Sequence, residues 1–309
     1  MCRLGLATLT WLTIAVRVSA ADIFVDNVLG DDRHDGTSTV AANRSSGPLR
    51  SITQALRNAR AGDRIVVAKT DRPYRESLSL TGGRHSGSSL QPFVIEGNGA
   101  TLEGAEPIPH EEWQYDRGQV FRYRPARTSY QQLFLDGKPA VRRYLVSLHG
   151  RLPDLNPLEW CLFNGSIYFC VEKDKLPEDY RLSCAALSVG ITLYEVHDLV
   201  VSDLVVQGYQ LDGVNAHDGV RECLLTGLTC RGNGRAGIAV MGASRVEISG
   251  CLLGDNGLAQ LYTEGQSLAS VEDCQLLPGS APPILRRGRR LFVDGERVDQ
   301  PKTPSTKTN

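Results

Sequence analysis

Apolar residues recur along the chain from residue 191 onward, with a period of 23 or 24 residues. In each repeat they form three pairs, and the two members of a pair are separated by one residue. Alternate residues of a strand point to the same side of a sheet, so each pair marks the inward side of a short strand. The six columns are Ile191, Val214, Ile238, Leu261; Leu193, Ala216, Val240, Thr263; Leu199, Cys223, Val246, Ala269; Val201, Leu225, Ile248, Val271; Leu204, Leu228, Cys251, Cys274; and Val206, Cys230, Leu253, Leu276.

Three short strands per repeat form one coil of a parallel β-helix, and stacked coils bury the six columns against one another. A helical solenoid would instead space its apolar residues three and four positions apart. The pattern therefore predicts an all-β solenoid with three strands per coil. Residue types that tolerate left-handed turns stand between the strands. They form one column of Asp203, Gly227, Gly250 and Asp273 and another of Asn233 and Asn256.

The remaining segments are expected to close or decorate this solenoid. Pro48 to Ala61 carries apolar residues at helical spacing, which predicts a helix covering the open N-terminal end. Residues 107–186 break the period and are richer in Trp, Tyr and Pro, so we interpret them as a β-rich insertion. Its Asn164-Gly165 pair suits a tight hairpin turn. Leu291 to Val298 predicts a hairpin that caps the last coil.

The chain begins like an exported protein. Arg3 precedes an apolar run from Leu4 to Val16, and the small residues Val18 and Ala20 fit a cleavage site before Ala21. No later stretch approaches the roughly 20 apolar residues that a membrane span needs. A secreted or periplasmic protein is therefore expected. The predicted organisation is a signal peptide (1–20), an N-terminal cap with the first coils (21–106), the insertion (107–186), the main coils with a capping hairpin (187–298) and a disordered tail (299–309).

Charge and cysteine content narrow the function further. The net charge of −1 gives no reason to expect a nucleic-acid partner. Removing Cys2 with the signal peptide leaves seven of the eight cysteines, an odd number without CxxC spacing. Neither a disulfide framework nor a zinc site is indicated. The cysteines in the apolar columns are interpreted as small buried hydrophobic residues.

Several segments resemble secreted bacterial right-handed β-helix proteins of the pectin-lyase-like superfamily. The resemblance lies in Phe24 to Gly36, Gly47 to Val67, Tyr74 to Leu80 and the corner-plus-strand unit Asn233 to Ile238. It covers most of the chain outside the insertion and implies a right-handed coil. The superfamily includes polysaccharide lyases, glycoside hydrolases and epimerases, and the chain carries no complete catalytic signature of any one of them. The resemblance thus implies polysaccharide as the partner and leaves the chemistry open.

The repeat register also predicts which outward side chains share a face. Neighbouring coils lie about 4.8 Å apart, so His217 and Glu264, two coils apart, should be separated by roughly 10 Å. The other polar outward residues of this face are Asn215, Tyr262 and Arg287, beside the apolar Ala239, Met241 and Leu285. Arg231 and Arg235 lie in the corner that leads into the middle strand.

These residues suggest a lyase acting on acidic glycans. His217, Tyr262 or Glu264 could exchange a proton with the substrate. Arginines could hold a uronic-acid carboxylate and stabilise the enolate formed when the adjacent proton leaves. The predicted substrate-binding residues are Arg231, Arg235, Asn215 and Arg287. Two alternatives stay open: a non-catalytic solenoid that binds glycan or builds the cell surface, and a glycoside hydrolase. For the hydrolase, Asp212 and Glu222 have no carboxylate partner identifiable from the sequence.

An acidic opening segment is a candidate calcium site. Asp26, Asp31, Asp32 and Asp35 offer the oxygen ligands that calcium prefers. Their spacing is not that of an EF-hand loop, and aspartates in a glycine-rich loop often bond their own backbone instead. Calcium is therefore the one cofactor that the sequence raises.

Overall fold

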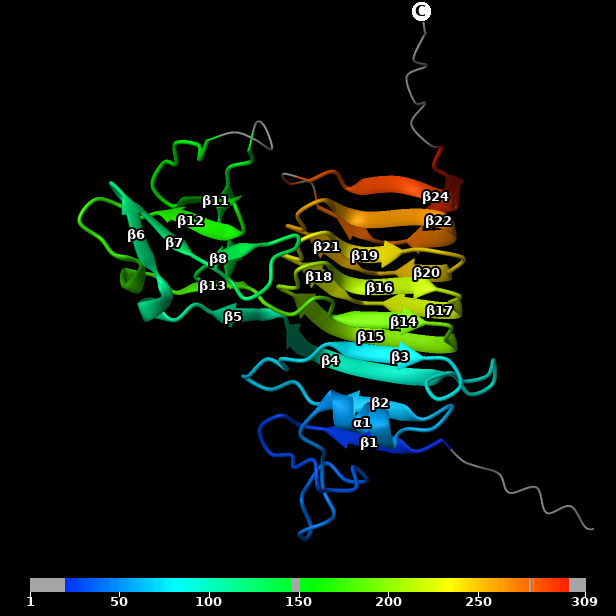
Figure 1. The fold of residues 1–309 in the computed structure, drawn as a ribbon. Helices are drawn as coiled ribbons and strands as arrows, with labels where there is room; N and C mark the ends of the chain where they lie inside the picture. The colour runs from blue at the N-terminus through cyan, green and yellow to red at the C-terminus, as the bar shows by residue number, and fades with distance from the viewer. Residues whose placement is uncertain (1–19, 146–150, 278, 280, 300–309) are drawn as a thin grey trace, which may run out of the picture.

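The computed structural model describes residues 20–145, 151–277, 279 and 281–299, which form a parallel β-helix with a smaller β-structure projecting from its side (Figure 1). The predicted signal peptide, apart from Ala20, and the predicted tail, apart from Asp299, lie outside the described residues. The fold is the right-handed parallel β-helix that the repeat and the resemblance predicted. No helix among the described residues is long and apolar enough to cross a membrane.

Three parallel sheets run along the solenoid. The first comprises β1 (Asp22–Val25), β2 (Arg64–Val67), β4 (Phe93–Glu103), β15 (His197–Gln207), β17 (Arg221–Thr226), β20 (Arg245–Ser249) and β22 (Ala259–Glu272). The second comprises β3 (Leu78–Thr81), β14 (Ile191–Tyr194), β16 (Asp212–Asp218), β19 (Ala236–Val240), the start of β22, and β24 (Ile284–Val293). The third stacks the ends of β4 and β15 on β18 (Thr229–Arg231), β21 (Leu252–Gly254) and β23 (Gln275–Leu276).

The strand register confirms the predicted columns. Leu199 pairs with Cys223, which pairs with Val246 and then with Ala269. These side chains and the other columns fill one continuous core. Burial raises the pKa of the Cys223 and Cys230 thiols to about 12, because an apolar core disfavours a thiolate. Both cysteines therefore act as packing residues, as predicted.

The corners between strands also follow the prediction. Asp203, Gly227, Gly250 and Asp273 have φ values of 53°, 62°, 60° and 51°, the left-handed conformation that such corners require. At the other predicted corner the asparagines stack, because the backbone N–H and the side-chain amide of Asn233 both donate to Asn256 Oδ1 at 3.0 Å. This ladder satisfies polar groups that the turn would otherwise leave buried and unpaired.

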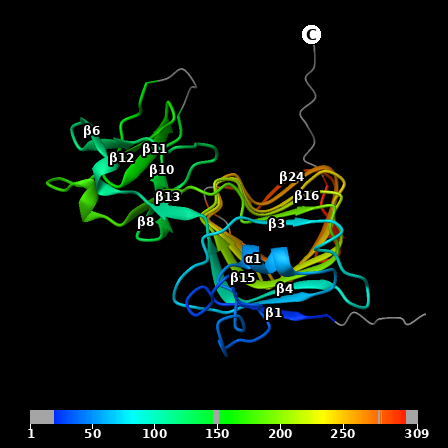
Figure 2. The ribbon, with the colours of Figure 1, turned by 60° about the horizontal axis from the view of Figure 1, so that its bottom comes forward.

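The N-terminal end of the solenoid is covered by helix α1 (Ile52–Asn58), which is shorter than the predicted Pro48 to Ala61 (Figure 2). Ser51 is extended and its hydroxyl accepts a hydrogen bond from the Gln54 N–H, so the helix begins after it. Leu49 forms a β-bridge to Val25 instead of a helical turn. Ile52 and Ala55 are fully buried against the first coil.

The insertion contains two small sheets with a core of their own around Trp160 and Phe169. Its hairpin turn pairs Phe163 with Ser166, and Asn164 and Gly165 have φ values of 47° and 74°, as predicted for that turn. One sheet has the order β6 (Gln114–Arg117), β7 (Val120–Tyr123), β12 (Ser166–Cys170), β11 (Glu159–Phe163) and β10 (Val141–Arg142). The other has the order β5 (Ala105–Pro107), β13 (Leu182–Ala185), β8 (Leu133–Leu135) and β9 (Lys138–Pro139), and two short 3₁₀ helices are η1 (His110–Glu112) and η2 (Pro177–Asp179).

The C-terminal coil ends in the predicted hairpin. β24 turns at Asp294-Gly295 and pairs antiparallel with β25 (Glu296–Arg297), with Phe292 opposite Arg297. Arg286 donates hydrogen bonds to the Val298 and Arg289 carbonyls, which ties the end of the hairpin to the start of β24. The hairpin thus occupies part of the edge that the last coil would otherwise expose.

The stability of the N-terminal cap formed by α1 should depend on pH through His85. Its Nδ1 accepts the Thr81 N–H at 3.1 Å, and Nε2 lies 3.0 Å from the Leu56 carbonyl oxygen of α1. Burial lowers the pKa of His85, so the folded protein binds this proton less readily than the unfolded chain. We expect the free energy of unfolding to include the full contribution of neutral His85 at about pH 7.5. This contribution should decrease as the pH drops through about 6.5 and below.

Urea unfolding followed across this pH range measures the effect. The variant His85→Gln should show a smaller loss of stability on acidification, whereas His217→Gln, at an exposed position, should keep the wild-type slope. Equal slopes in all three proteins would show that His85 does not control the acid sensitivity.

Candidate functional site

A chain of polar contacts crosses the side of β16, β19 and β22 that points away from the core of the solenoid. We call this side the outer face. Asn215 Nδ2 donates to Asp212 Oδ2 at 2.9 Å, and Arg235 holds the same carboxylate through Nε at 2.9 Å and Nη2 at 2.5 Å. The Arg235 guanidinium carbon lies 5.5 Å from the centroid of the Tyr262 ring. The Tyr262 hydroxyl donates to Glu264 Oε2 at 2.8 Å. Four predicted site residues therefore meet around Asp212.

Burial governs the electrostatics of this cluster. The Asp212 side chain is 0% exposed and that of Arg235 is 15% exposed. Burial raises the pKa of the Asp212 carboxyl, and the bonds from Arg235 act in the opposite direction. The pKa of Tyr262 is also raised, first by burial and then by the Glu264 carboxylate. Tyr262 is consequently a phenol at neutral pH and a poor proton acceptor.

The sequence did not single out Asp212 as a site residue. It opens β16, where the register pairs it with Ala236 on the next coil. Its carboxylate bonds Asn215 and Arg235, although strand alternation groups it with the inward Val214 and Ala216. Its partner Arg235 stands 23 residues later, which is one coil of the solenoid. A search for opposite charges at that spacing would have found the pair, since stacked coils place such residues side by side.

Three other predicted residues take no part in this chain of contacts. His217 is exposed, and its ring packs 6.0 Å from that of Tyr194 on the preceding coil, while Tyr262 is two coils further on. Arg287 is exposed on β24 in register with Glu264 and lowers the pKa of Tyr262 slightly against the larger effect of burial. Arg231 points away from the outer face and belongs to a different ladder.

That ladder runs across the third sheet beside the insertion. Arg231 Nε donates to Gln207 Oε1 at 2.7 Å, and Gln207 Nε2 donates to Glu103 Oε2 at 2.7 Å. The second carboxylate oxygen of Glu103 accepts the Ala105 N–H at 3.0 Å. The three side chains come from adjacent coils, because Glu103, Gln207 and Arg231 share one register position. A fixed row of donors and acceptors results.

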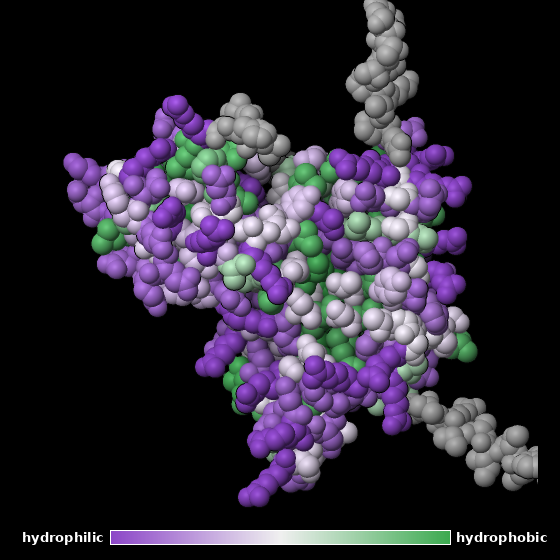
Figure 3. All heavy atoms as spheres, viewed as in Figure 1, coloured by the Kyte–Doolittle hydropathy of each residue, from purple (hydrophilic) through white to green (hydrophobic). Residues whose placement is uncertain are grey.

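A cavity of ≈480 Å³, which we call the insertion cleft, opens over this ladder, between the solenoid and the insertion. Figure 3 shows the two bodies meeting in the middle of the molecule, with apolar side chains gathered on the solenoid beside the junction. A volume of this size is typical of ligand sites. The insertion supplies Phe134, Lys138 and Ser183, and the next coil supplies Asp255.

A second cavity of ≈600 Å³, the lower cleft, continues from the first along the insertion. It extends past η1 and η2. The two cavities share Glu103, Ala105, Gly137 and Ser183 as lining residues. The sequence did not predict either cavity, because the insertion has no repeat from which its position against the coils could be deduced.

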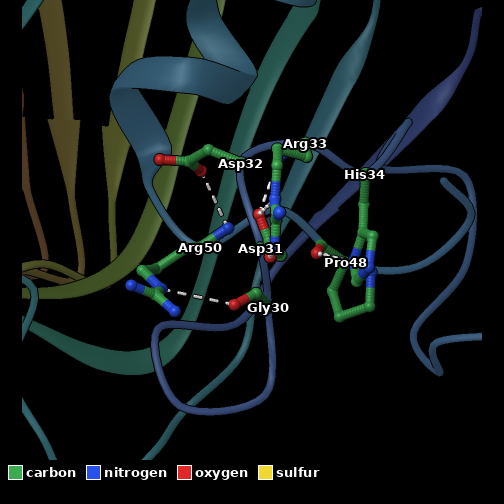
Figure 4. A network of polar contacts seen from close by, with 7 residues as sticks. All are labelled: Gly30, Asp31, Asp32, Arg33, His34, Pro48 and Arg50. Carbon is green, nitrogen blue, oxygen red and sulfur yellow. Dashed lines mark hydrogen bonds and ion pairs between the residues drawn. The ribbon is translucent and has the colours of Figure 1, made fainter. Parts of the chain in front are cut away.

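The acidic opening segment is held by its own loop (Figure 4). Asp31 pairs with Arg33, while Asp32 accepts the N–H groups of Arg50 and Ser51 at 2.9 Å. Asp26 and Asp35 likewise accept backbone N–H groups of nearby residues. No group of three or more potential metal ligands occurs in the part of the chain that the structure describes. Calcium binding at these aspartates stays a prediction from the sequence.

Comparison with known proteins supports the architecture. Residues 184–281 match the family model of the right-handed β-helix region. A solved structure titled "Glycoside hydrolase" is similar with a TM-score of 0.58 and 13% identity, covering 82% of this chain and 73% of that one. Another, titled "The complex structure of XylC with xylose", has a TM-score of 0.43 and 11% identity, covering 87% and 70%. No curated protein matches the sequence. At such identities the first likeness shows a shared fold.

The Asp212–Arg235 pair yields a stability prediction. Arg235→Ala should lower the free energy of unfolding by about 3–5 kcal/mol, because it leaves a buried carboxylate without its partner. Adding Asp212→Asn should recover part of that loss by removing the charge. Arg231→Ala, at an exposed arginine of the same corner, should change stability by about 0.5 kcal/mol or less. Urea unfolding of the four proteins measures these differences, and a double variant no more stable than Arg235→Ala would contradict the explanation.

Proposed function

We propose that this protein is an exported carbohydrate-binding β-helix protein and that a polysaccharide chain lies in the insertion cleft. The observation that carries the proposal is the ladder of Glu103, Gln207 and Arg231 along the wall of a ≈480 Å³ cavity. Export rests on the signal-peptide pattern of residues 1–20. The similar fold of a protein titled "Glycoside hydrolase" supports a carbohydrate ligand.

The chemistry of the ladder suits sugar hydroxyls. A hydroxyl both donates and accepts, so it can bond a carboxylate or amide oxygen and a guanidinium in the same site. The three side chains already hold one another, which reduces the conformational entropy lost on binding. Lys138 and Asp255 add charged groups to the lining, and the buried Phe134 packs beneath it with Ala105.

Binding should depend on this wall. Arg231→Ala and Glu103→Gln should each weaken polysaccharide binding by about tenfold, a loss comparable to one charge-assisted hydrogen bond of about 1.5 kcal/mol. Arg289→Ala, an exposed arginine on β24 outside both cavities, is the matched control and should bind as the wild type does. Affinity electrophoresis in gels containing different polysaccharides gives the comparison. Equal retardation of all four proteins would show that the polysaccharide does not bind in the insertion cleft.

Hydrolysis at the outer face is a second candidate function. The register aligns Asp212 with Ala259, so Glu264 is offset from Asp212 by two coils and by five residues along the strand, roughly 16 Å in the strand direction. This separation is wider than the 6.5–9.5 Å of inverting glycosidases, so the two carboxylates would have to approach each other to act on one bond. Their environments differ, because Asp212 is buried with a raised pKa whereas Glu264 is partly exposed. Asp212 lies beneath Arg235, so catalysis would require that side chain to move, and binding is therefore the first proposal.

The products distinguish the possible reactions. A hydrolase releases new reducing ends, whereas a lyase forms unsaturated sugars that absorb ultraviolet light. We expect the protein to release reducing ends from a glycan that it binds. The variant Glu264→Gln should lose this activity, and Glu247→Gln, on a different sheet, should keep it. Ultraviolet-absorbing products would support elimination in place of hydrolysis. Neither product from any bound glycan would leave binding as the function.

A further inference from the structure

The insertion cleft and the lower cleft form one groove. They share four lining residues, and the shared β5 and β13 of the insertion run along both. The groove therefore begins at Asp255 and Arg231 on the later coils, passes Glu103, and continues to His110 and Tyr180 on the insertion. A site of this extent suits a chain of several sugars.

Charge is distributed unevenly along the groove. In the insertion cleft, Arg231 and Lys138 balance Glu103 and Asp255. In the lower cleft, two arginines stand against four carboxylates. The carboxylates are Glu103, Asp136, Glu178 and Asp179, and the arginines are Arg75 and Arg181.

The arginines of the lower cleft are also engaged by the protein. Arg181 Nε donates to Asp136 Oδ1 at 2.9 Å, and Arg75 donates to the Ala105 carbonyl oxygen. Glu178 and Asp136 are exposed and face solvent as negative charges. Although the Arg181 side chain is 86% exposed, the carboxylates outnumber the arginines by two, so an anionic chain entering here meets a net negative charge, which costs binding energy at low salt.

We propose that the groove takes a neutral polysaccharide and rejects polyuronates. This inference rests on the proposed function and narrows its substrate class. A neutral chain bonds through hydroxyls, for which carboxylates are acceptors and the Glu103 ladder provides donors and acceptors together. The acidic stretch then acts as a specificity element, because it repels the competitor and leaves the neutral ligand unaffected.

The test compares neutral polysaccharides, xylan and mixed-linkage β-glucan, with polygalacturonate and alginate by affinity electrophoresis at low and at moderate salt. We expect retardation by a neutral polysaccharide with little salt dependence, and none by the polyuronates at low salt. The double variant Asp136→Asn/Glu178→Gln removes two exposed charges and releases Arg181. It should gain polyuronate binding of at least about tenfold while its affinity for the neutral chain stays within about twofold.

The outcomes separate the two proposals. If no polysaccharide retards the protein, the proposed function itself fails. If a polyuronate binds the wild type more tightly than the neutral chains do, the function stands and the inference about neutral substrates is overturned. An unchanged preference in the double variant, with circular dichroism like that of the wild type, would also overturn the role assigned to the acidic stretch.

Discussion

The stacking of inward apolar side chains from coil to coil is the interaction on which the rest of this structure depends. Each coil is too small to bury its own strands, so a column such as Ile191, Val214, Ile238 and Leu261 becomes stable only when neighbouring coils contact one another. The backbone ladders then fix the register. Once the inward residues are placed, every alternate residue must point outward at a set height. The register of this core therefore determines the spacing of the polar networks on the surface.

Repetition decided what could be deduced from the sequence. The columns and the left-handed corners at Asp203 and Gly227 follow from residue types at a constant period, and the structure has them as predicted. The two hairpins follow from local residue patterns, and they too are present. The helix ends were less predictable, because the Ser51 cap competes with a longer apolar pattern. The register also grouped Asn215, Tyr262, Glu264 and Arg235 correctly. It misled for Arg231, whose side chain belongs to another sheet.

The parts that escaped prediction involve contacts without a period. Asp212 bonds Asn215 and Arg235 of the outer face, although strand alternation groups it with the inward Val214 and Ala216. The clefts depend on how the insertion packs against the coils, through contacts such as the hydrogen bonds from Gln210 Nε2 to the Arg127 carbonyl oxygen and to Gln131 Oε1. The protein thus has two polar regions of different origin. The outer face is produced by the repeat, whereas the groove is produced by the junction of a repetitive and a non-repetitive body.

The way the insertion joins the solenoid leaves the coil count undisturbed. The chain departs after β4 and returns at β14 and β15, which pair directly with β3 and β4, so the coils on either side are immediate neighbours. The solenoid closes as if the intervening residues were a single turn. Such an attachment makes the insertion an exchangeable module in evolution. A new module grafted between Glu103 and Ile191 would meet the same wall of side chains and create a groove of different shape, without any change to the scaffold beneath it.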